Sequence, residues 1–391
     1  MSKIVFITSR FPYPINKGDQ LRVFFQLKSL SRKNEVYLIA LSDKKIDQEL
    51  YSHLSFCKDI QVFRTSTLTQ IVSMSKCLIN QKPFQVGYFF NKSAKETIVE
   101  YINQVEPDYI HCHLLRTVEY IKNITGIEKS LDFMDAFSIG MKKRGDIEKN
   151  LFKKVFLLSE YRRLKKYERE MFNYFDRFTI ISDQDAHFID HPRSGEIVVV
   201  PNGVDFDSFY PRNEEKIYDI CFMGNMSYPP NVEAIKYTMA NILPLLLNKK
   251  PNLKFLIAGA NPTSYIQQLR SKNIDVIENF HHISDSIAMS RIMISPMVVS
   301  IGLQNKIIQA MAMKVPNVVS KSANRAIHAK QSLEIFEAGQ PNEYVEAILT
   351  LLENKNTYNS IIDHAFRFVK EKYHWEKVNT ILEHTIKGQS E

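Results

Sequence analysis

The segment GLQNKIIQAMAMKVP, residues 302–316, combines residue types that can bind an anion. Lys306 and Gln309 are three residues apart, so they share one face of the helix that this segment predicts. Gly302 and Asn305 would lie at the N-terminus of that helix, where free backbone N–H groups and the helix dipole favour negative charge. A lysine is unfavourable there unless an anion faces it, and a phosphate group is the candidate. The alternative is an exposed lysine at a helix start.

A second group of polar residues follows the first apolar segment of the chain. Lys17, Gly18, Asp19 and Arg22 open a helical pattern that begins after two prolines. Gly18 relieves the turn and Asp19 can cap the helix, while Lys17 and Arg22 are again cations near the positive end of a helix dipole. The pattern predicts that the helix turns three side chains toward the core, Leu21, Phe24 and Phe25.

Two histidines and an arginine occur in the segment 108–117. His111 and His113 alternate on a predicted strand and therefore point to the same face. Two histidines at this spacing could bind a metal, but no third ligand is evident, so a strand end that lines an acceptor site is the favoured interpretation. Arg116, just beyond, could contact an acceptor phosphate.

The elements that must position these residues alternate between apolar strands and helical patterns. Short segments rich in Ile, Val and Phe predict two successive series of buried parallel strands, separated by the polar segment PRNEEK at 211–216. This alternation predicts an α/β chain with two Rossmann-like, doubly wound domains, and ligands bind outside the carboxyl ends of such strands. The first series is expected at 3–9, 35–41, 60–64, 108–113, 130–135, 177–182 and 196–201, and the second at 218–224, 254–259, 275–279, 292–297 and 316–320.

Length and composition agree with two globular domains. The chain has 391 residues, of which 44% are hydrophobic and 24% charged, and no apolar run approaches the ~20 residues of a membrane-spanning helix. The four cysteines show no CxxC spacing, which favours reduced thiols and a cytoplasmic location. The net charge of +8 suits phosphorylated ligands or an anionic membrane, whereas aromatic and basic residues do not interleave as they do in nucleic-acid-binding motifs.

The longest helical pattern, residues 146–176, carries seven lysines and arginines in its central part, Lys153 to Arg169. The favoured interpretation is a solvated face of an amphipathic helix. The alternative is peripheral contact with an anionic membrane surface, at the inner face of the plasma membrane.

The segment PNGVD, residues 201–205, adds a more specific signal before the linker. It resembles the family-four retaining glycosyltransferases, which have the GT-B fold, with a nucleotide-sugar between two Rossmann-like domains. FPYPINKGDQLRVFFQL, FMGNMSYPPNVEAI, GLQNKIIQAMAMKVP and the closing YHWEKVNTILEHTI are similar to a bacterial subgroup of sugar transferases associated with exopolysaccharide loci. The resemblance spans nearly the whole chain. It implies an acceptor-side domain at 1–210, joined by a returning C-terminal helix at 370–391, and a donor-binding domain at 217–369.

The resemblance also implies roles for individual residues. Lys306 would hold the diphosphate and stabilise its departure. In relatives a histidine after the fifth strand lies near the transferred sugar; here Asp135, together with Asp132, occupies that neighbourhood, and a carboxylate there could orient a sugar hydroxyl or help deprotonate an acceptor. The alternative for Asp135 is a helix cap. No metal and no cofactor are expected. The donor site would use Gly18, Asn202, Gly224, Asn225, Gly302, Leu303, Asn305, Lys306 and Gln309, and the acceptor side Lys17, Arg22, His113 and Arg116.

The chain departs from the family pattern at the helix that faces the donor. Gln309 stands where the family usually has a glutamate, Ile301 stands where many members have a second one, and the loop FMGNMSYPPN lacks a phosphate-binding arginine. The expected function is transfer of a sugar from a nucleoside-diphosphate sugar to a lipid-linked saccharide, polysaccharide or other glycan. The alternatives are a non-catalytic nucleotide-sugar-binding partner of a glycosyltransferase complex and a sugar-nucleotide epimerase of the same fold.

Overall fold

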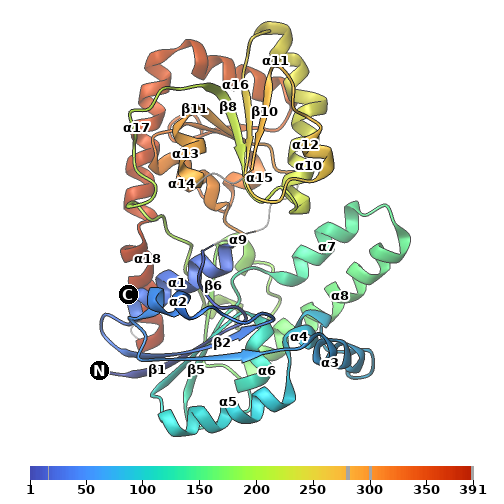
Figure 1. The fold of residues 1–391 in the computed structure, drawn as a ribbon, viewed down its shortest axis with the longest axis vertical. Coiled ribbons are helices and arrows are strands. Elements are labelled where there is room, and N and C mark those ends of the chain that lie inside the picture. The colour runs from blue at the N-terminus through green and yellow to red at the C-terminus, as the bar shows by residue number, and fades with distance from the viewer. Residues whose placement is uncertain (16, 279–281, 299–301, 389–391) are drawn as a thin grey trace. The chain divides into compact units, whose positions relative to one another are not determined.

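The computed structural model describes residues 1–391 except 16, 279–281, 299–301 and 389–391 (Figure 1). The chain forms two compact units, of which unit 1 is Met1–Pro201 with Val378–Glu391 and unit 2 is Asn202–Lys377. The divisions thus lie at 201/202 and 377/378, whereas the sequence suggested the linker 211–216 and a helix start at 370. Residues before that linker pack on unit 2, because the Val204 N–H donates to the Tyr373 carbonyl at 2.7 Å.

Unit 1 contains a seven-stranded sheet in the order β3-β2-β1-β4-β5-β6-β7, and every pairing in it is parallel. The order reverses between β1 and β4, so the loops after these two strands diverge and leave room for a ligand at their carboxyl ends. The strands are β1 (Lys3–Thr8), β2 (Glu35–Ser42), β3 (Asp59–Arg64), β4 (Tyr109–His113), β5 (Glu128–Asp132), β6 (Arg177–Ile180) and β7 (Ile197–Val199).

Helices connect these strands, and their starts follow the capping residues. Ser66, Asn91 and Asn150 each accept a backbone N–H at the first turn of α3, α5 and α8. The helices are α1 (Gly18–Leu30), α2 (Gln48–Tyr51), α3 (Thr67–Asn80), α4 (Phe84–Phe89), α5 (Lys92–Val105), α6 (Val118–Ile121), α7 (Phe137–Ile147), α8 (Leu151–Glu170) and α9 (Asp183–Ala186).

The predicted inward face of α1 is wrong. Val23, Leu27 and Leu30 are its buried apolar side chains, and Arg22 and Gln26 are buried with them, whereas Leu21, Phe24 and Phe25 are only partly buried. The predicted cap is also wrong, because α1 begins at Gly18 and Asp19 lies in its first turn, where it pairs with Arg10.

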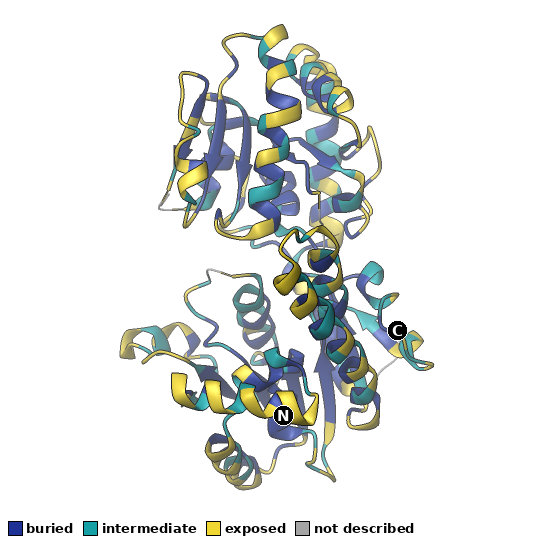
Figure 2. Cartoon of the chain, turned by 90° about the vertical axis from the view of Figure 1, so that its right-hand side faces the viewer, coloured by how far each residue is buried: buried dark blue, intermediate teal, exposed yellow. Residues whose placement is uncertain are grey.

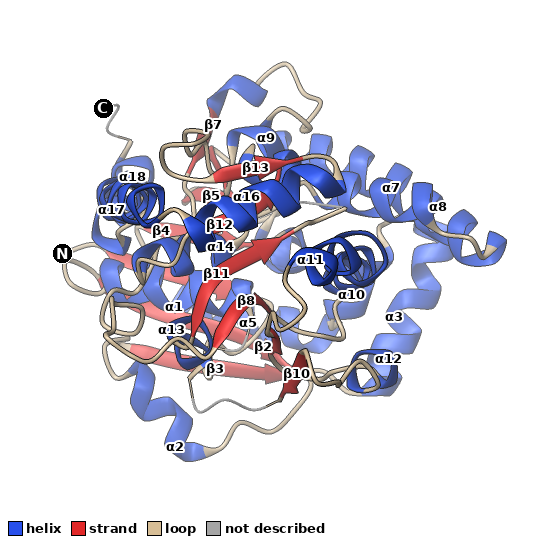
Figure 3. Cartoon of the chain, turned by 90° about the horizontal axis from the view of Figure 1, so that it is seen from above, coloured by secondary structure: helices blue, strands red, loops and turns tan. Residues whose placement is uncertain are grey.

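Unit 2 contains a six-stranded parallel sheet in the order β10-β9-β8-β11-β12-β13. In Figure 3 its paired strands β8 and β11 run side by side with helices around them. The strands are β8 (Tyr218–Met223), β9 (Phe255–Ala258), β10 (Ile274–Ile277), β11 (Ser290–Ser295), β12 (Asn317–Ser320) and β13 (Phe336–Ala338). The helices are α10 (Pro229–Tyr237), α11 (Leu243–Lys249), α12 (Ser264–Gln267), α13 (Ile283–Ala288), α14 (Asn305–Ala312), α15 (Lys321–Asn324), α16 (Pro341–Glu353) and α17 (Lys355–Lys372).

The last helix, α18 (Trp375–Lys387), begins in unit 2 and continues into unit 1. In unit 1 the Glu383 carboxylate accepts from Ser29 Oγ at 3.1 Å and pairs with Lys33 Nζ at 2.8 Å. Asn379 Nδ2 donates to the Phe25 carbonyl at 3.0 Å. Residues from both ends of the sequence therefore pack together in unit 1.

The predicted α/β architecture, two Rossmann-like units each with a parallel sheet, is confirmed. Most strands are buried, although the edge strand β3 is only partly so, and the helices carry exposed outer faces (Figure 2). Among the helices that the structure describes, none is long and apolar enough to cross a membrane.

Candidate functional site

Lys306 lies in the first turn of α14, as predicted, but it is buried rather than exposed. Its Nζ donates to Asn231 Oδ1 at 2.9 Å and lies 4.1 Å from the centroid of the Phe222 ring. Burial lowers the pKa of Lys306 to about 7, because the charged form loses its hydration. In the described part of the chain no carboxylate pairs with this ammonium group. The alternative of a solvated lysine at a helix start is therefore wrong.

The loop after β8 packs closely against the neighbouring strand, which requires glycine at two positions. Gly224 has φ +149°, and a Cβ there would lie 2.7 Å from Asn231 Nδ2. Gly259, with φ +143°, lies so close that its Cβ would be 1.8 Å from the Gly224 carbonyl oxygen. Asn231 Nδ2 also donates to the Asn225 carbonyl at 2.9 Å. Asn231 therefore joins the Gly224–Asn225 loop to Lys306.

The N-terminal end of α14 brings further predicted donor residues together. Asn305 Oδ1 accepts from Asn202 Nδ2 at 3.1 Å, which fixes the PNGVD segment on this helix. Gln309 lies one turn beyond Asn305 and is half-buried. Gly302, with φ +63°, and Leu303 are buried just before the helix. Unit 2 thus gathers these donor candidates at the carboxyl end of its sheet, while Ile301 falls outside the described residues.

Asn231 was missed by the sequence analysis, although it is the residue that contacts both the glycine loop and the lysine. The signal that could have found it is the segment PPN at the start of α10, where Pro229 and Pro230 fix the first turn. An asparagine next to a glycine turn has the amide geometry to bond a loop carbonyl with its nitrogen and a cation with its oxygen.

Gly18 and Arg22 lie on α1 in unit 1. Arg22 has no exposed side-chain surface, and its Nε and Nη2 donate to the Asp132 carboxylate at 2.6 and 3.1 Å. Its Nη1 donates to the Val200 carbonyl at 2.6 Å. Arg22 holds the pKa of Asp132 well below its usual range despite the burial that opposes this shift. The structure places Arg22 inside the unit rather than at a surface that an acceptor could contact, whereas Lys17 is exposed.

Asp135 lies between β5 and α7 and is half-buried. Burial and the neighbouring Asp185 carboxylate raise the pKa of Asp135 to about 7. The alternative role as a helix cap is wrong, because Ala136 is the N-cap of α7 and the Ser138 N–H donates to Glu168 Oε1 at 2.9 Å. Asp135 is thus a carboxyl group whose charge changes near neutral pH.

Arg116 lies near Asp135, and its positive charge acts on both Asp135 and Asp19. Its Nη2 donates to Gln85 Oε1 at 3.1 Å, and its guanidinium carbon lies 5.1 Å from the Phe89 ring and 4.9 Å from the Phe137 ring. This guanidinium is therefore held between two aromatic rings close to a titrating carboxyl group.

The two histidines of β4 are fully buried. His111 Nδ1 contacts Ser130 Oγ at 2.7 Å, and His113 Nδ1 contacts Thr8 Oγ1 at 3.4 Å. Burial lowers the pKa of His111 to about 3 and that of His113 to about 4, so both are neutral at pH 7. His113 Nε2 is buried without a hydrogen-bond partner among the residues that the structure describes. Within those same residues, no three metal-binding side chains come together.

Known proteins resemble this chain in sequence and in fold. Residues 218–354, most of unit 2 and about a third of the chain, match the family model "Glycosyl transferases group 1". A relative from Klebsiella pneumoniae, "Uncharacterized 44.6 kDa protein in cps region", is 23% identical over 97% of this chain and 98% of its own length.

Two solved structures share the fold over the whole chain. Sucrose-phosphate synthase from Thermosynechococcus elongatus is 12% identical, with a TM-score of 0.75 and coverage of 99% of each chain. HepE from Anabaena, in complex with UDP and glucose, is 12% identical, with a TM-score of 0.71 and coverage of 99% of this chain and 100% of its own. These similarities establish the GT-B fold for this chain.

Proposed function

We propose that the protein transfers a sugar from a nucleoside-diphosphate sugar to a hydroxyl group of a lipid-linked saccharide, polysaccharide or other glycan. Transfer would proceed with retention at the anomeric carbon and without a metal ion. The bond from the anomeric carbon to the diphosphate breaks, a bond to the acceptor oxygen forms, and the acceptor proton leaves to a base or to the departing diphosphate. The match of unit 2 to a glycosyltransferase family model supports this reaction class.

The observation that carries the proposal is the buried ammonium group of Lys306. It has a neutral amide as its hydrogen-bond partner, and the described residues place no carboxylate beside it. A buried cation without an opposite charge is costly, and an anion bound in front of it removes that cost. The N–H groups at the start of α14 would add further donors. A diphosphate is the anion that suits such a site.

Each proposed residue has a distinct task. Lys306 would stabilise the charge that develops on the leaving diphosphate, which is the largest electrostatic demand of this reaction. Gln309 would bond the ribose hydroxyls as a neutral amide, more weakly than a carboxylate would. Asp135, whose pKa lies near 7, would take the acceptor proton or orient a sugar hydroxyl.

Three further facts support the proposed substrate class and the proposed cellular location of the reaction. HepE, which has the same fold, binds UDP and glucose, and the K. pneumoniae relative belongs to a cps region. The four cysteine side chains are free, as in proteins of a reducing compartment. We therefore place the reaction in the cytoplasm and in polysaccharide synthesis.

The first experiment measures the melting temperature of the protein with saturating UDP, GDP, dTDP, ADP or CMP. A ligand at ~100 times its dissociation constant adds about 2.7 kcal/mol of stability, so the cognate base should stand out. Lys306→Met keeps the apolar stem over Phe222 and removes the charge, and it should abolish this shift. Lys314→Met is the matched control, since this half-exposed lysine follows the same helix and pairs with Asp363 at 2.7 Å. Its nucleotide shift should remain.

The outcomes separate the alternatives. A nucleotide shift that Lys306→Met leaves intact would remove Lys306 from the donor site. Nucleotide binding without sugar transfer, with no gain of turnover in Gln309→Glu, would favour the non-catalytic partner. Conversion of the nucleotide-sugar itself, without an acceptor, would favour the epimerase.

A further inference from the structure

Unit 1 carries an unusual concentration of exposed apolar side chains on α3 and α8. About half of the large apolar side chains that are exposed in the described part of the chain lie on α3, on the start of α8, or on the residue that ends α7. Soluble proteins rarely expose apolar residues in contiguous groups, and such a group marks an interaction surface.

The exposed residues of α3 form one stripe. They follow steps of three, four and seven residues, so they share one side of the helix, and Ile79 is 87% exposed. The buried side of the same helix is formed by Gln70 and Cys77. The stripe consists of Leu68, Ile71, Val72, Leu78 and Ile79.

The first two turns of α8 expose a second apolar group, Leu151, Phe152, Val155 and Phe156, with Phe152 89% exposed. We call the nine residues of these two groups the docking face. Both helices contact α4, because Phe84 packs on Phe156 at 5.4 Å and Gly87 lies against Cys77 on the buried side of α3. The two groups of the docking face therefore lie on helices that flank α4 in unit 1.

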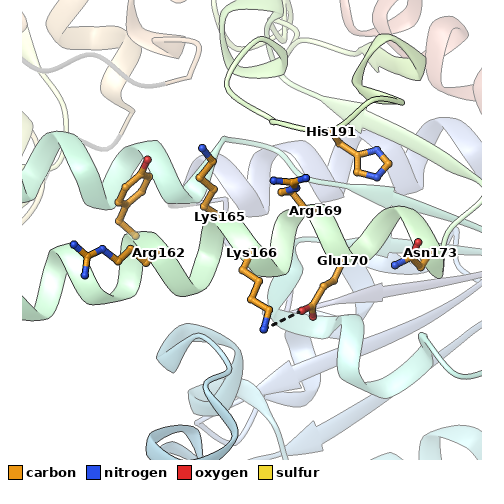
Figure 4. Close-up of a pocket in the computed structure, with 8 residues that line it drawn as sticks. Arg162, Lys165, Lys166, Arg169, Glu170, Asn173 and His191 are labelled. Carbon is orange, nitrogen blue, oxygen red and sulfur yellow. Dashed lines mark ion pairs between the residues drawn. The ribbon is translucent and has the colours of Figure 1, made fainter.

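Further along α8 the same stripe becomes basic. Leu151 and Val155 are continued, at steps of seven and four, by Arg162 and Lys166, and both of these side chains are exposed. Figure 4 shows Arg162, Lys165, Lys166 and Arg169 projecting from this part of the helix. Lys165 and Arg169 lie 3.1 and 3.7 Å from the Asp190 carboxylate, and Lys166 lies 3.9 Å from Glu170. Arg162 extends from the helix away from Glu170 (Figure 4).

We propose that the docking face inserts into the surface of a lipid bilayer and that the basic half of α8 contacts its anionic headgroups. The step from Val155 to Arg162 is about 10 Å along the helix axis, at 1.5 Å per residue. An interfacial helix lies in the plane of the bilayer surface, so apolar side chains at its start can enter the acyl boundary while basic side chains further along the helix contact the headgroups. This surface is independent of the nucleotide chemistry proposed above.

A second copy of this chain is the competing occupant, and the charges argue against it. Lys153 and Lys154 lie between Phe152 and Val155 at the start of α8, and Lys76 lies within the α3 stripe. Apposing two copies through this face would bring lysines of both together, which repel each other. A bilayer that contains anionic lipid offers the opposite charge.

The test measures binding of the full chain to vesicles of phosphatidylcholine mixed with phosphatidylglycerol, and to vesicles of phosphatidylcholine alone. The double variant Arg162→Gln/Lys166→Gln should weaken binding to the anionic vesicles about fivefold for each charge removed. The double variant Ile79→Ser/Phe152→Ser should weaken it at high salt as well, because it removes the apolar insertion. All four positions are exposed, so thermal unfolding should change little.

Matched control variants remove the same kinds of side chain from exposed positions outside the docking face. Lys355→Gln/Lys370→Gln takes two exposed charges from α17, and Ile217→Ser removes an exposed isoleucine of unit 2. Both should bind vesicles as the unmodified protein does. Equal losses in the controls, or no binding to anionic vesicles, would overturn the proposal. Self-association that Ile79→Ser/Phe152→Ser disrupts, without vesicle binding, would assign the face to a second copy.

Discussion

Asp135 is one of the groups whose ionisation falls near neutral pH. Its pKa in the folded protein, about 7, is above the value of ~3.9 expected for an unfolded aspartate. Between these two values the folded state holds a proton that the unfolded state has lost. Stability therefore falls as the pH rises from about 4 to about 7, and the loss persists above pH 7.

Above pH 7, Asp135→Asn should therefore raise the free energy of unfolding by on the order of 2 kcal/mol and raise the melting temperature with it. Near pH 4 the substitution should change both quantities little. If Asp135 takes the acceptor proton, the variant should also lose the rise of kcat/KM through pH 7. The measurements are melting curves and rates across this pH range. The control is Asp207→Asn at an exposed position of unit 2. An equal change of stability at every pH would contradict the raised pKa.

The types and spacing of residues predicted Lys306 at a helix N-terminus, but not its burial. Burial depends on Phe222 and Asn231, which come from β8 and α10 and meet α14 only in the folded unit. Arg22 shows the same limit. Its partner Asp132 lies far along the chain, so no local pattern could distinguish a buried ion pair from a surface cation.

At the level of elements, the sequence predicted most strands because parallel strands are continuous apolar runs. β13 was missed, since Phe336–Ala338 has only three residues with Glu337 in its middle. The long helix predicted at 146–176 begins later than expected, at Leu151. Asn150 caps α8, and its side chain accepts the Lys153 N–H at 3.1 Å, which favours a new helix over a continuous one.

The contact between β8 and β9 gives a prediction at this scale. Gly259→Ala would place a methyl group 1.8 Å from the Gly224 carbonyl oxygen at a φ that favours glycine. We expect a loss of about 2–3 kcal/mol and a weaker nucleotide shift, because the Gly224–Asn225 loop must move. Urea unfolding measures the first effect.

Gly195→Ala is the control for this substitution. A Cβ there meets nothing within 4 Å, so its effect should stay below about 0.5 kcal/mol. Equal effects of the two substitutions would show that the close approach of Gly259 to Gly224 is unimportant.

At the scale of the whole molecule, unit 1 depends on the last helix of the chain. Val378, Leu382 and Ile386 of α18 are buried, and each contributes about 1.5–3 kcal/mol of apolar burial. A chain that ends at Lys377 should therefore lose most of the stability of unit 1, because ordinary domains have only about 5–15 kcal/mol in total. Hydrogen exchange measured separately over the two units checks this result.

A chain that ends at Gly388 is the control, since it keeps all of α18. It should exchange like the full chain. In the chain that ends at Lys377, unit 2 keeps all of its own strands, so its nucleotide shift should persist. Undiminished protection of unit 1 in that shorter chain would contradict the role of α18.

The return of α18 to unit 1 also sets the order in which the protein can be completed during synthesis. A ribosome adds about 5–20 residues per second, so the segment Asn202–Lys377 delays the closing of unit 1 by roughly ten to thirty seconds. Unit 2 is continuous in sequence and can finish folding in that interval. Unit 1 is thus translated first but completed last, because the surface that packs against Val378 and Leu382 stays uncovered until the end of the chain has been synthesised.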